Sequence, residues 1–303
     1  MVDTLDKLMA KVGKLPTMPH VASKILELVG NPETSARQLQ VVIDSDQVLA
    51  MRILKVANSA LYSLPRKVKT LKEAIVMLGF NHIRSLVLAE AIQNLFKGKG
   101  KRGDLLESML WEHSVGAAMA AKTVAVKVHP ALSEEAFVTT LVHDIGKLIL
   151  LQSDPQGYHE IVQRIYSEYQ PFGGLEIERY DVDHAEVGAA LAERWNLHER
   201  AVAAIREHHD DTDGDVLTDL VRLGNAMAWK AEWGFRKEPD LELGTLSCAQ
   251  RLGLGEDALL ELLATTRELM AKERATFGVP ELGRTRREGE GAEDEAAEQP
   301  ADA

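Results

Sequence analysis

The chain has 303 residues, of which 45% are hydrophobic, 27% charged and only 5% aromatic. This composition is typical of a globular protein, and its leucine, alanine, valine and isoleucine content favours packed helices over a β-sandwich. One cysteine, Cys248, excludes an internal disulfide framework and favours a reducing compartment. There is no signal-peptide pattern and no run of about 18 apolar residues, so we expect a soluble, cytoplasmic protein without a membrane partner.

The net charge of −12 arises largely at the C-terminus. Residues 288–303 contain seven acidic and no basic side chains, whereas residues 1–287 carry 35 basic and 40 acidic ones. The nearest approach to a basic patch, Lys97, Lys99, Lys101 and Arg102, alternates with glycine and is interpreted as a solvated linker. Because phosphate-backbone contacts need clustered lysine and arginine, we expect no nucleic-acid partner.

Helical periodicity dominates the first hundred residues. Apolar side chains recur on one face of the segment from His20 to Val29, which Asn31-Pro32 should end. Ser35 is a candidate N-cap for the next helix. Further helices are predicted for Val48–Ser63, Leu71–Leu78 and His82–Leu95.

A second group of helices follows the linker. The predicted helices are Glu107–Val128, Ser133–Gln152, Gln156–Tyr169, Asp183–Trp195 and Glu199–His209. Asp183 and Glu186 have the spacing of a capping box, which places His184 in the first turn of its helix. Pro171 and Gly173-Gly174 are interpreted as a break before it.

These patterns predict an all-α protein of two packed helical subdomains. The expected divisions are an N-terminal helical subdomain over 1–100, a second over 104–235, a helical appendage over 236–280, and a disordered acidic tail over 281–303.

Ten histidines are present, and five of them stand out by their order along the chain. His143 and Asp144 are adjacent within an otherwise apolar segment, LVHDIGKLI, where buried ionisable groups need a partner or a metal. Successive side chains on a helix diverge by about 100°, so a shared ion would need ligands from neighbouring helices. His113, His184 and the pair His208-His209 are candidates for those ligands. The remaining histidines are interpreted as surface or structural residues: His20, His82, His129, His159 and His198.

The alternative is that His143 and Asp144 form only a structural hydrogen-bonded pair. A mixed nitrogen and oxygen ligand set suits Fe, Mn, Zn or Mg. Lys147, four residues after His143 and predicted on the same helix face, would bind a phosphate oxygen in a phosphohydrolase, or would otherwise be an exposed lysine.

Over residues 10–235 the sequence resembles the HDOD family, the HD-related output domains of bacterial signalling proteins. The resemblance is carried by LPTMPHVASKILELV, by the NSALY and AIVMLGF elements, and by LWEHS, LVHDIGKLILL and HAEVGAALAERWNLHERAVAAIREHH. It implies an N-terminal helical subdomain packed on an HD-like helical subdomain, and a role in bacterial signal transduction, often without catalysis.

The related HD-GYP phosphodiesterases, which hydrolyse cyclic di-GMP, have a similar order of motifs. By this resemblance the matching residues are His113, His143, Asp144, Lys147, His184, His208 and His209. Asn225 stands where a final aspartate ligand is expected, and no GYP segment follows His209. The second departure removes support for a cyclic di-GMP pocket.

Two functions follow from these observations. The favoured one is a regulatory HDOD module with a divalent-metal cluster that acts through signalling-protein partners. The alternative is a metal-dependent phosphohydrolase of a nucleotide or phosphodiester, in which Asp144 and Lys147 would be catalytic.

Overall fold

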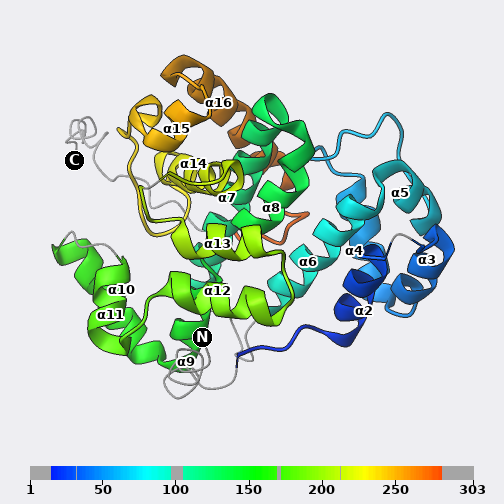
Figure 1. The fold of residues 1–303 in the computed structure, drawn as a ribbon, viewed down its shortest axis with the longest axis horizontal. Helices are drawn as coiled ribbons and strands as arrows, with labels where there is room; N and C mark the ends of the chain where they lie inside the picture. The colour runs from blue at the N-terminus through cyan, green and yellow to red at the C-terminus, as the bar shows by residue number, and fades with distance from the viewer. Residues whose placement is uncertain (1–14, 32, 97–104, 169–171, 212, 282–303) are drawn as a thin grey trace, which may run out of the picture.

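In the computed structural model the described residues are 15–31, 33–96, 105–168, 172–211 and 213–281. Within these ranges the chain forms α-helices, short 3-10 turns and loops, and no β-strand (Figure 1). The predicted all-α fold is therefore confirmed.

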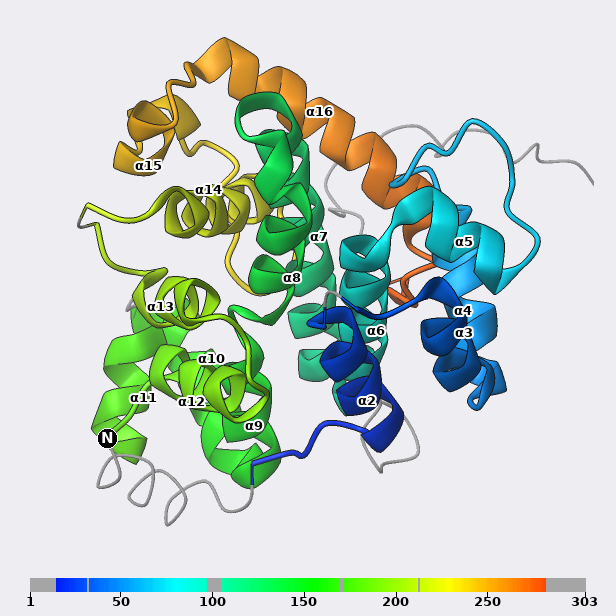
Figure 2. The same ribbon diagram turned by 45° about the vertical axis from the view of Figure 1, so that its right-hand side comes forward.

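The N-terminal helices pack around their own aliphatic cluster. They are α2 (His20–Val29), α3 (Ala36–Asp44), α4 (Gln47–Ala57), α5 (Leu71–Leu78) and α6 (Phe80–Phe96). Ile25, Leu39, Ile53 and Ile75 are buried at the centre of this cluster. Figure 2 shows these helices grouped on one side of the molecule. In the described ranges no single helix is long and apolar enough to cross a membrane, although α5 and α6, bent by 118°, pass that test as a pair.

Side-chain caps determine where these helices begin and end. Ser35 accepts a hydrogen bond from the Gln38 amide, and the Gln38 side chain accepts one from the Ser35 amide, which completes a capping box. The helix predicted over Val48–Ser63 is too long, because α4 ends at Ala57. Asn58 ends it by donating to the Leu54 and Val68 carbonyls and accepting from the Val68 amide.

The second group of helices surrounds α7, which is buried along most of its length. Its members are α7 (Leu105–Val128), α8 (Ser133–Val142), α9 (Ile145–Ser153), α10 (Pro155–Glu168), α11 (Phe172–Tyr180), α12 (His184–Arg194), α13 (Glu199–Glu207) and α14 (Val216–Lys230). A short 3-10 turn, Pro130–Leu132, connects α7 to α8, and both α8 and α14 pack against α7. As a result, α7 is the central helix of the larger hydrophobic cluster.

Two predictions about this group are wrong. The single helix expected over Ser133–Gln152 is broken, because α8 ends at Val142 and α9 begins at Ile145, which leaves His143 and Asp144 in the turn between them. The break expected near Gly173-Gly174 is instead the first turn of α11. Burial of Phe172 and Leu175 stabilises α11 despite its two glycines.

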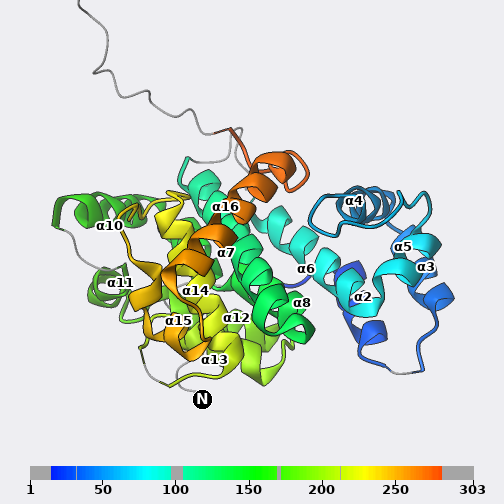
Figure 3. The same cartoon turned by 90° about the horizontal axis from the view of Figure 1, so that it is seen from above.

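The C-terminal helices connect the two clusters. The 3-10 turn Leu243–Thr245 leads into α15 (Ser247–Arg251) and α16 (Glu256–Glu273), and Figure 3 shows α16 lying across α7. After α16, the Phe277 carbonyl accepts hydrogen bonds from Trp111 on α7 (2.9 Å) and from Gln93 on α6 (2.5 Å). Glu273 accepts one from the Ala60 amide (2.6 Å). This segment therefore ties α7 to the N-terminal helices.

The predicted division into ranges remains a prediction. Part of it concerns 1–14, the glycine–lysine linker over 97–104 and the acidic tail over 282–303, which lie outside the described residues, as do Pro32 and Pro171. One helix, α6, contributes to both clusters: Ile83 and Val87 to the N-terminal one, Leu88 and Ile92 to the larger one. A helix that is apolar on all sides suits this shared position.

Candidate metal centre

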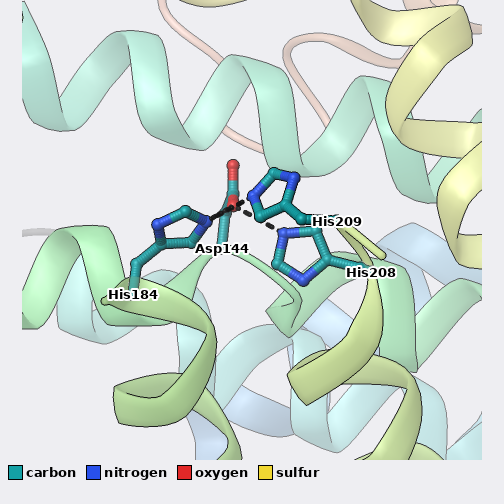
Figure 4. Close-up of side chains that lie close together, drawn as sticks. All are labelled: Asp144, His184, His208 and His209. Atoms are coloured by element: carbon teal, nitrogen blue, oxygen red, sulfur yellow. Dashed lines mark hydrogen bonds and ion pairs between the residues drawn. The ribbon is translucent and has the colours of Figure 1, made fainter. Parts of the chain in front are cut away.

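Four separate segments bring the candidate ligands together. His113 comes from α7, His143 and Asp144 from the α8–α9 turn, and His184 from the first residue of α12, while the pair His208-His209 follows the end of α13. Figure 4 shows the side chains of Asp144, His184, His208 and His209 pointing toward one another. The five histidines set aside in the sequence analysis lie outside the possible metal-binding groups of the described residues.

Asp144 is at the centre of this cluster, and its two carboxylate oxygens face different imidazoles. Oδ2 lies 3.5 Å from Nε2 of His113 and 3.5 Å from Nε2 of His143. Oδ1 lies 3.3 Å from Nε2 of His184 and 3.5 Å from Nε2 of His208. One carboxylate is thus shared by two groups of nitrogen ligands.

Hydrogen bonds at Nδ1 orient four of the rings. The pairs are His113 with the Trp233 carbonyl (3.2 Å), His143 with the Thr140 carbonyl (2.6 Å), His184 with the Glu176 carboxylate (2.5 Å) and His208 with the Ile205 carbonyl (2.7 Å). Each partner is an acceptor, so Nδ1 carries the proton and Nε2 of a neutral ring presents a lone pair to the cluster. Burial lowers the pKa of His113, His143 and His208, which favours the neutral form.

Several of these atoms are buried without any hydrogen-bond partner. Of eight such side-chain atoms in the described part of the chain, five belong to the cluster: Nε2 of His113, His143 and His208, Oδ1 of Asp144 and Oδ1 of Asn225. Each unsatisfied buried polar atom lowers the folding stability by about 1–3 kcal/mol. Five such atoms in one place indicate a site for a ligand that all of them could bind. Imidazole nitrogens and carbonyl or carboxylate oxygens are ligands of a borderline or hard divalent ion. The residues present therefore fit a metal.

Lys147 forms an ion pair with Asp144. Its Nζ lies 2.7 Å from Asp144 Oδ2 and 4.6 Å from the centre of the Phe172 ring. Burial alone would raise the pKa of Asp144, but the neighbouring His143 ring and the Lys147 ammonium hold it well below its usual range, so the side chain is a carboxylate. The expected alignment of Lys147 with His143 on one helix face is wrong, because the break before α9 pairs Lys147 with Asp144.

A close approach of two backbones sets the position of Asp144 relative to His184. A Cβ atom on Gly146 would lie 2.0 Å from the His184 carbonyl oxygen, so only glycine lets α9 pack this closely on α12. At the start of α12, the Asp183 side chain accepts from the Glu186 amide (2.9 Å), as predicted. The other half of the predicted capping box is not formed, because the Glu186 carboxylate accepts a hydrogen bond from Arg206 (3.4 Å) and none from the described Asp183 amide.

Glu176 is a functional candidate that the sequence reasoning missed. It lies on α11 and is fully buried, and its Oε2 accepts hydrogen bonds from both Nδ1 (2.5 Å) and the backbone amide (2.9 Å) of His184. Tyr158 donates to Oε1 (2.7 Å). Burial would raise the pKa of Glu176, but His184 lowers it, so a carboxylate orients this imidazole. The signal was a glutamate on the apolar face formed by Phe172 and Leu175.

A second supporting network holds the end of α13. Arg222 on α14 donates to the Glu207 carbonyl (3.3 and 3.0 Å), directly before His208. Asp219 accepts from Arg222 (3.3 Å) and, through both carboxylate oxygens, from Arg251 on α15 (2.8 and 2.7 Å). The C-terminal appendage therefore helps to position His208 and His209.

Most of the cluster lines a cavity of about 640 Å³. Its lining residues include His113, Asp144, Lys147, His208, His209 and Asn225, together with the aromatic side chains of Phe172, Trp229 and Phe235. Exposed His209 brings its Nε2 to 2.8 Å from that of His184. Arg236 stacks on Trp229 at 3.8 Å, which adds a cation to the cavity wall. A ligand in this cavity would contact the candidate metal ligands directly.

The sequence matches the HDOD domain model over residues 15–211, and the chain belongs to the HDOD family. It is 26% identical over 208 residues to an uncharacterized protein of Treponema pallidum, which covers 67% of this chain. The chain spans only 40% of the length of that relative.

Solved structures support the same fold. An HDOD domain protein of unknown function from Geobacter sulfurreducens is 26% identical, with a TM-score of 0.70 over 89% of this chain and 99% of its own. A Shewanella amazonensis protein, provisionally named a phosphohydrolase, is 24% identical, with a TM-score of 0.70 over 90% of this chain and 97% of its own. The latter likeness concerns the fold alone.

Replacing Gly146 tests the close contact between α9 and α12. We expect Gly146→Ala to lower the free energy of unfolding by about 1–3 kcal/mol, because the added methyl group meets backbone that cannot rotate away. Chemical denaturation measures the change. Gly174→Ala is the matched control, since its Cβ would have no atom within 4 Å. An equal effect of the two substitutions would contradict this account.

Replacing Glu176 tests the orientation of His184. Glu176→Gln keeps the size of the side chain but removes the charge facing Nδ1, so we expect Zn²⁺ or Mn²⁺ affinity to fall by about 10- to 100-fold. Calorimetric titration of the metal-free protein measures this. Glu178→Gln, on the same helix but exposed and paired with Arg164 (2.9 Å), should leave the affinity unchanged. Unaltered affinity in Glu176→Gln would remove this role.

Proposed function

We propose that the protein binds divalent metal ions at the histidine cluster and acts as a metal-dependent phosphohydrolase. The observation that carries the proposal is the group of five buried ligand atoms without hydrogen-bond partners, four of whose residues line the large cavity. A cation would satisfy these atoms together, which no single protein donor could do. The position of the cluster in an open cavity favours chemistry over a closed structural site.

The arrangement around Asp144 supports two ions. His113 and His143 form one group with Asp144, while His184, His208 and His209 form another with the same carboxylate; in each group the ligand atoms lie within 4.8 Å of one another. Asp144 would therefore bridge the two positions. Five imidazoles and one carboxylate favour Fe, Mn or Zn over Mg, which binds mainly oxygen ligands.

The chain's own residues would bind the phosphate ester beside these ions. A bound divalent ion would supply Lewis-acid stabilisation of the phosphoryl oxygens and activation of water. Lys147 lines the cavity and can donate to a phosphate oxygen, while Phe172, Trp229 and Phe235 provide apolar walls that exclude water from the reacting group. A nucleotide or another phosphate ester of similar size suits a cavity of about 640 Å³.

The second candidate is a signalling module in the bacterial cytoplasm that contacts protein partners and holds a metal as a structural element. Asn225 favours it. This side chain lies beside His113 at the cavity, where an aspartate would add a negative charge. A neutral amide binds a cation more weakly than a carboxylate does. The metal position beside His113 would therefore be filled less readily than the one beside His184, which suits a structural ion better than a two-ion catalytic centre.

Metal content and turnover test the proposal. Protein purified without chelator should contain at least about one equivalent of Fe, Mn or Zn and should hydrolyse a chromogenic phosphodiester or monoester. His143→Ala and Asp144→Ala should lower the rate at least about a hundredfold, because several kcal/mol of metal catalysis are lost. Exposed His129→Ala is the matched control. Less than about a tenth of an equivalent, also after incubation with metal, would exclude the metal centre. Full loading without turnover would favour the signalling module.

Restoring the acidic ligand tests the role of Asn225. We expect Asn225→Asp to tighten Mn²⁺ or Zn²⁺ binding about tenfold or more, because a carboxylate adds a negative charge at the position of an unpartnered amide oxygen. Competition with a chelator of known affinity measures the change. Unchanged affinity would place Asn225 outside the ligand set.

A further inference from the structure

A second large cavity lies where the N-terminal helices meet α12 and α13. It has a volume of about 580 Å³, and we call it the seam cavity. Its lining residues come from α2 and the segment before it, from Arg84 on α6, and from the end of α12 and the loop to α13: Thr17, Met18, Ser23, Leu26, Glu27, Gly30, Arg84, Arg194, Trp195, Asn196 and His198. Figure 1 shows α2 and α6 beside the end of α12. The seam cavity shares no lining residue with the cavity above Asp144.

The seam cavity contains two arginines that have no partner among the described residues. Neither half-buried Arg84 nor exposed Arg194 makes a hydrogen bond or ion pair with any described residue. By contrast, Arg179, Arg200 and Arg206 each pair with a carboxylate. A half-buried guanidinium without an acceptor is costly. An anionic ligand would offset this cost.

Two described carboxylates near the seam cavity are paired with other basic groups. Glu27 is the one carboxylate among the described lining residues, and it already pairs with Lys24 (2.8 Å). A smaller adjoining cavity of about 270 Å³ shares Arg84 and contains Glu134 and Glu135. Glu134 is paired with Lys122 and lies 3.4 Å from His82 Nε2. Of the two cavities that Arg84 lines, the seam cavity is therefore the more positively charged.

The remaining walls suit a small organic molecule that carries a phosphate. Planar guanidinium groups match phosphate oxygens, and Ser23 and Asn196 add uncharged polar groups. Trp195 is held in place by a hydrogen bond from its indole Nε1 to the Pro16 carbonyl (3.2 Å), and it lines the same cavity. Its ring gives an apolar surface for the organic part of the ligand. The volume is within the usual range for such molecules.

We infer that the seam cavity binds a small phosphorylated molecule, with its phosphate on Arg84 and Arg194. This site is separate from the metal centre and lies at the opposite ends of the helices that serve it. His184 begins α12 and His208 follows α13, whereas Arg194, Asn196 and His198 lie where these two helices are joined. Since Arg84 belongs to α6, the ligand would also link α12 and α13 to the N-terminal helices. This is the position of a regulatory ligand.

Calorimetric titration of the full chain tests the inference, with pyrophosphate and ADP as probes. The protein is first freed of metal with a chelator, which is then removed, so that phosphate cannot bind to ions at Asp144. We expect saturable binding of at least one probe by the native chain and by Asp144→Ala. Arg84→Gln and Arg194→Gln should each weaken it about tenfold or more, as is usual for the loss of a charge-assisted hydrogen bond.

Controls separate this site from general charge effects. Arg37→Gln removes an exposed arginine on α3, away from the seam cavity, and should leave the affinity unchanged. Melting temperatures confirm that each variant is folded. The inference is overturned if neither probe saturates at millimolar concentration, if Arg84→Gln and Arg194→Gln bind like the native chain, or if Arg37→Gln weakens binding equally. Loss of binding in Asp144→Ala alone would assign the probe to the metal centre instead.

Discussion

The structure depends on one buried carboxylate that its own surroundings only partly satisfy. Lys147 is paired with Oδ2 of Asp144, but Oδ1 has no hydrogen-bond partner in the part of the chain that the structure describes, and it faces two imidazoles. Neutral rings cannot balance a buried negative charge, and the desolvation cost of such a group is high. Cations held between Asp144 and the histidines would remove this imbalance, which is why the surrounding residues are best understood as a ligand set.

Much of the larger helical cluster serves to hold these side chains in place. Gly146 lets α9 approach α12, Glu176 fixes the ring of His184, and Arg222 holds the chain just before His208. These supports come from different helices, so precise placement of the ligands requires the packed fold as a whole. The appendage also takes part, because Arg251 on α15 holds Asp219, which in turn contacts Arg222.

The sequence predicted what depends on local pattern. Apolar periodicity and caps located α2, α5, α7 and the start of α12, and the order of the motifs identified side chains that the fold brings together around Asp144. It did not predict the helix break at His143, since a turn inside an apolar segment has no proline or glycine before it. It also missed α11, whose two glycines lower helix propensity while burial of Phe172 outweighs them. The seam cavity could not be predicted, because it depends on how α6 packs near α12.

The position of α14 affects how this fold can be divided. The family match ends at Asp211, before the helix that provides Asn225 and Arg222 and that packs along α7. A fragment excised at the family boundary would lose one wall of the cavity and expose the apolar flank of α7 to water. A shortened form of this protein should therefore retain α14, α15 and α16, which lie beyond the residues that the family model matches.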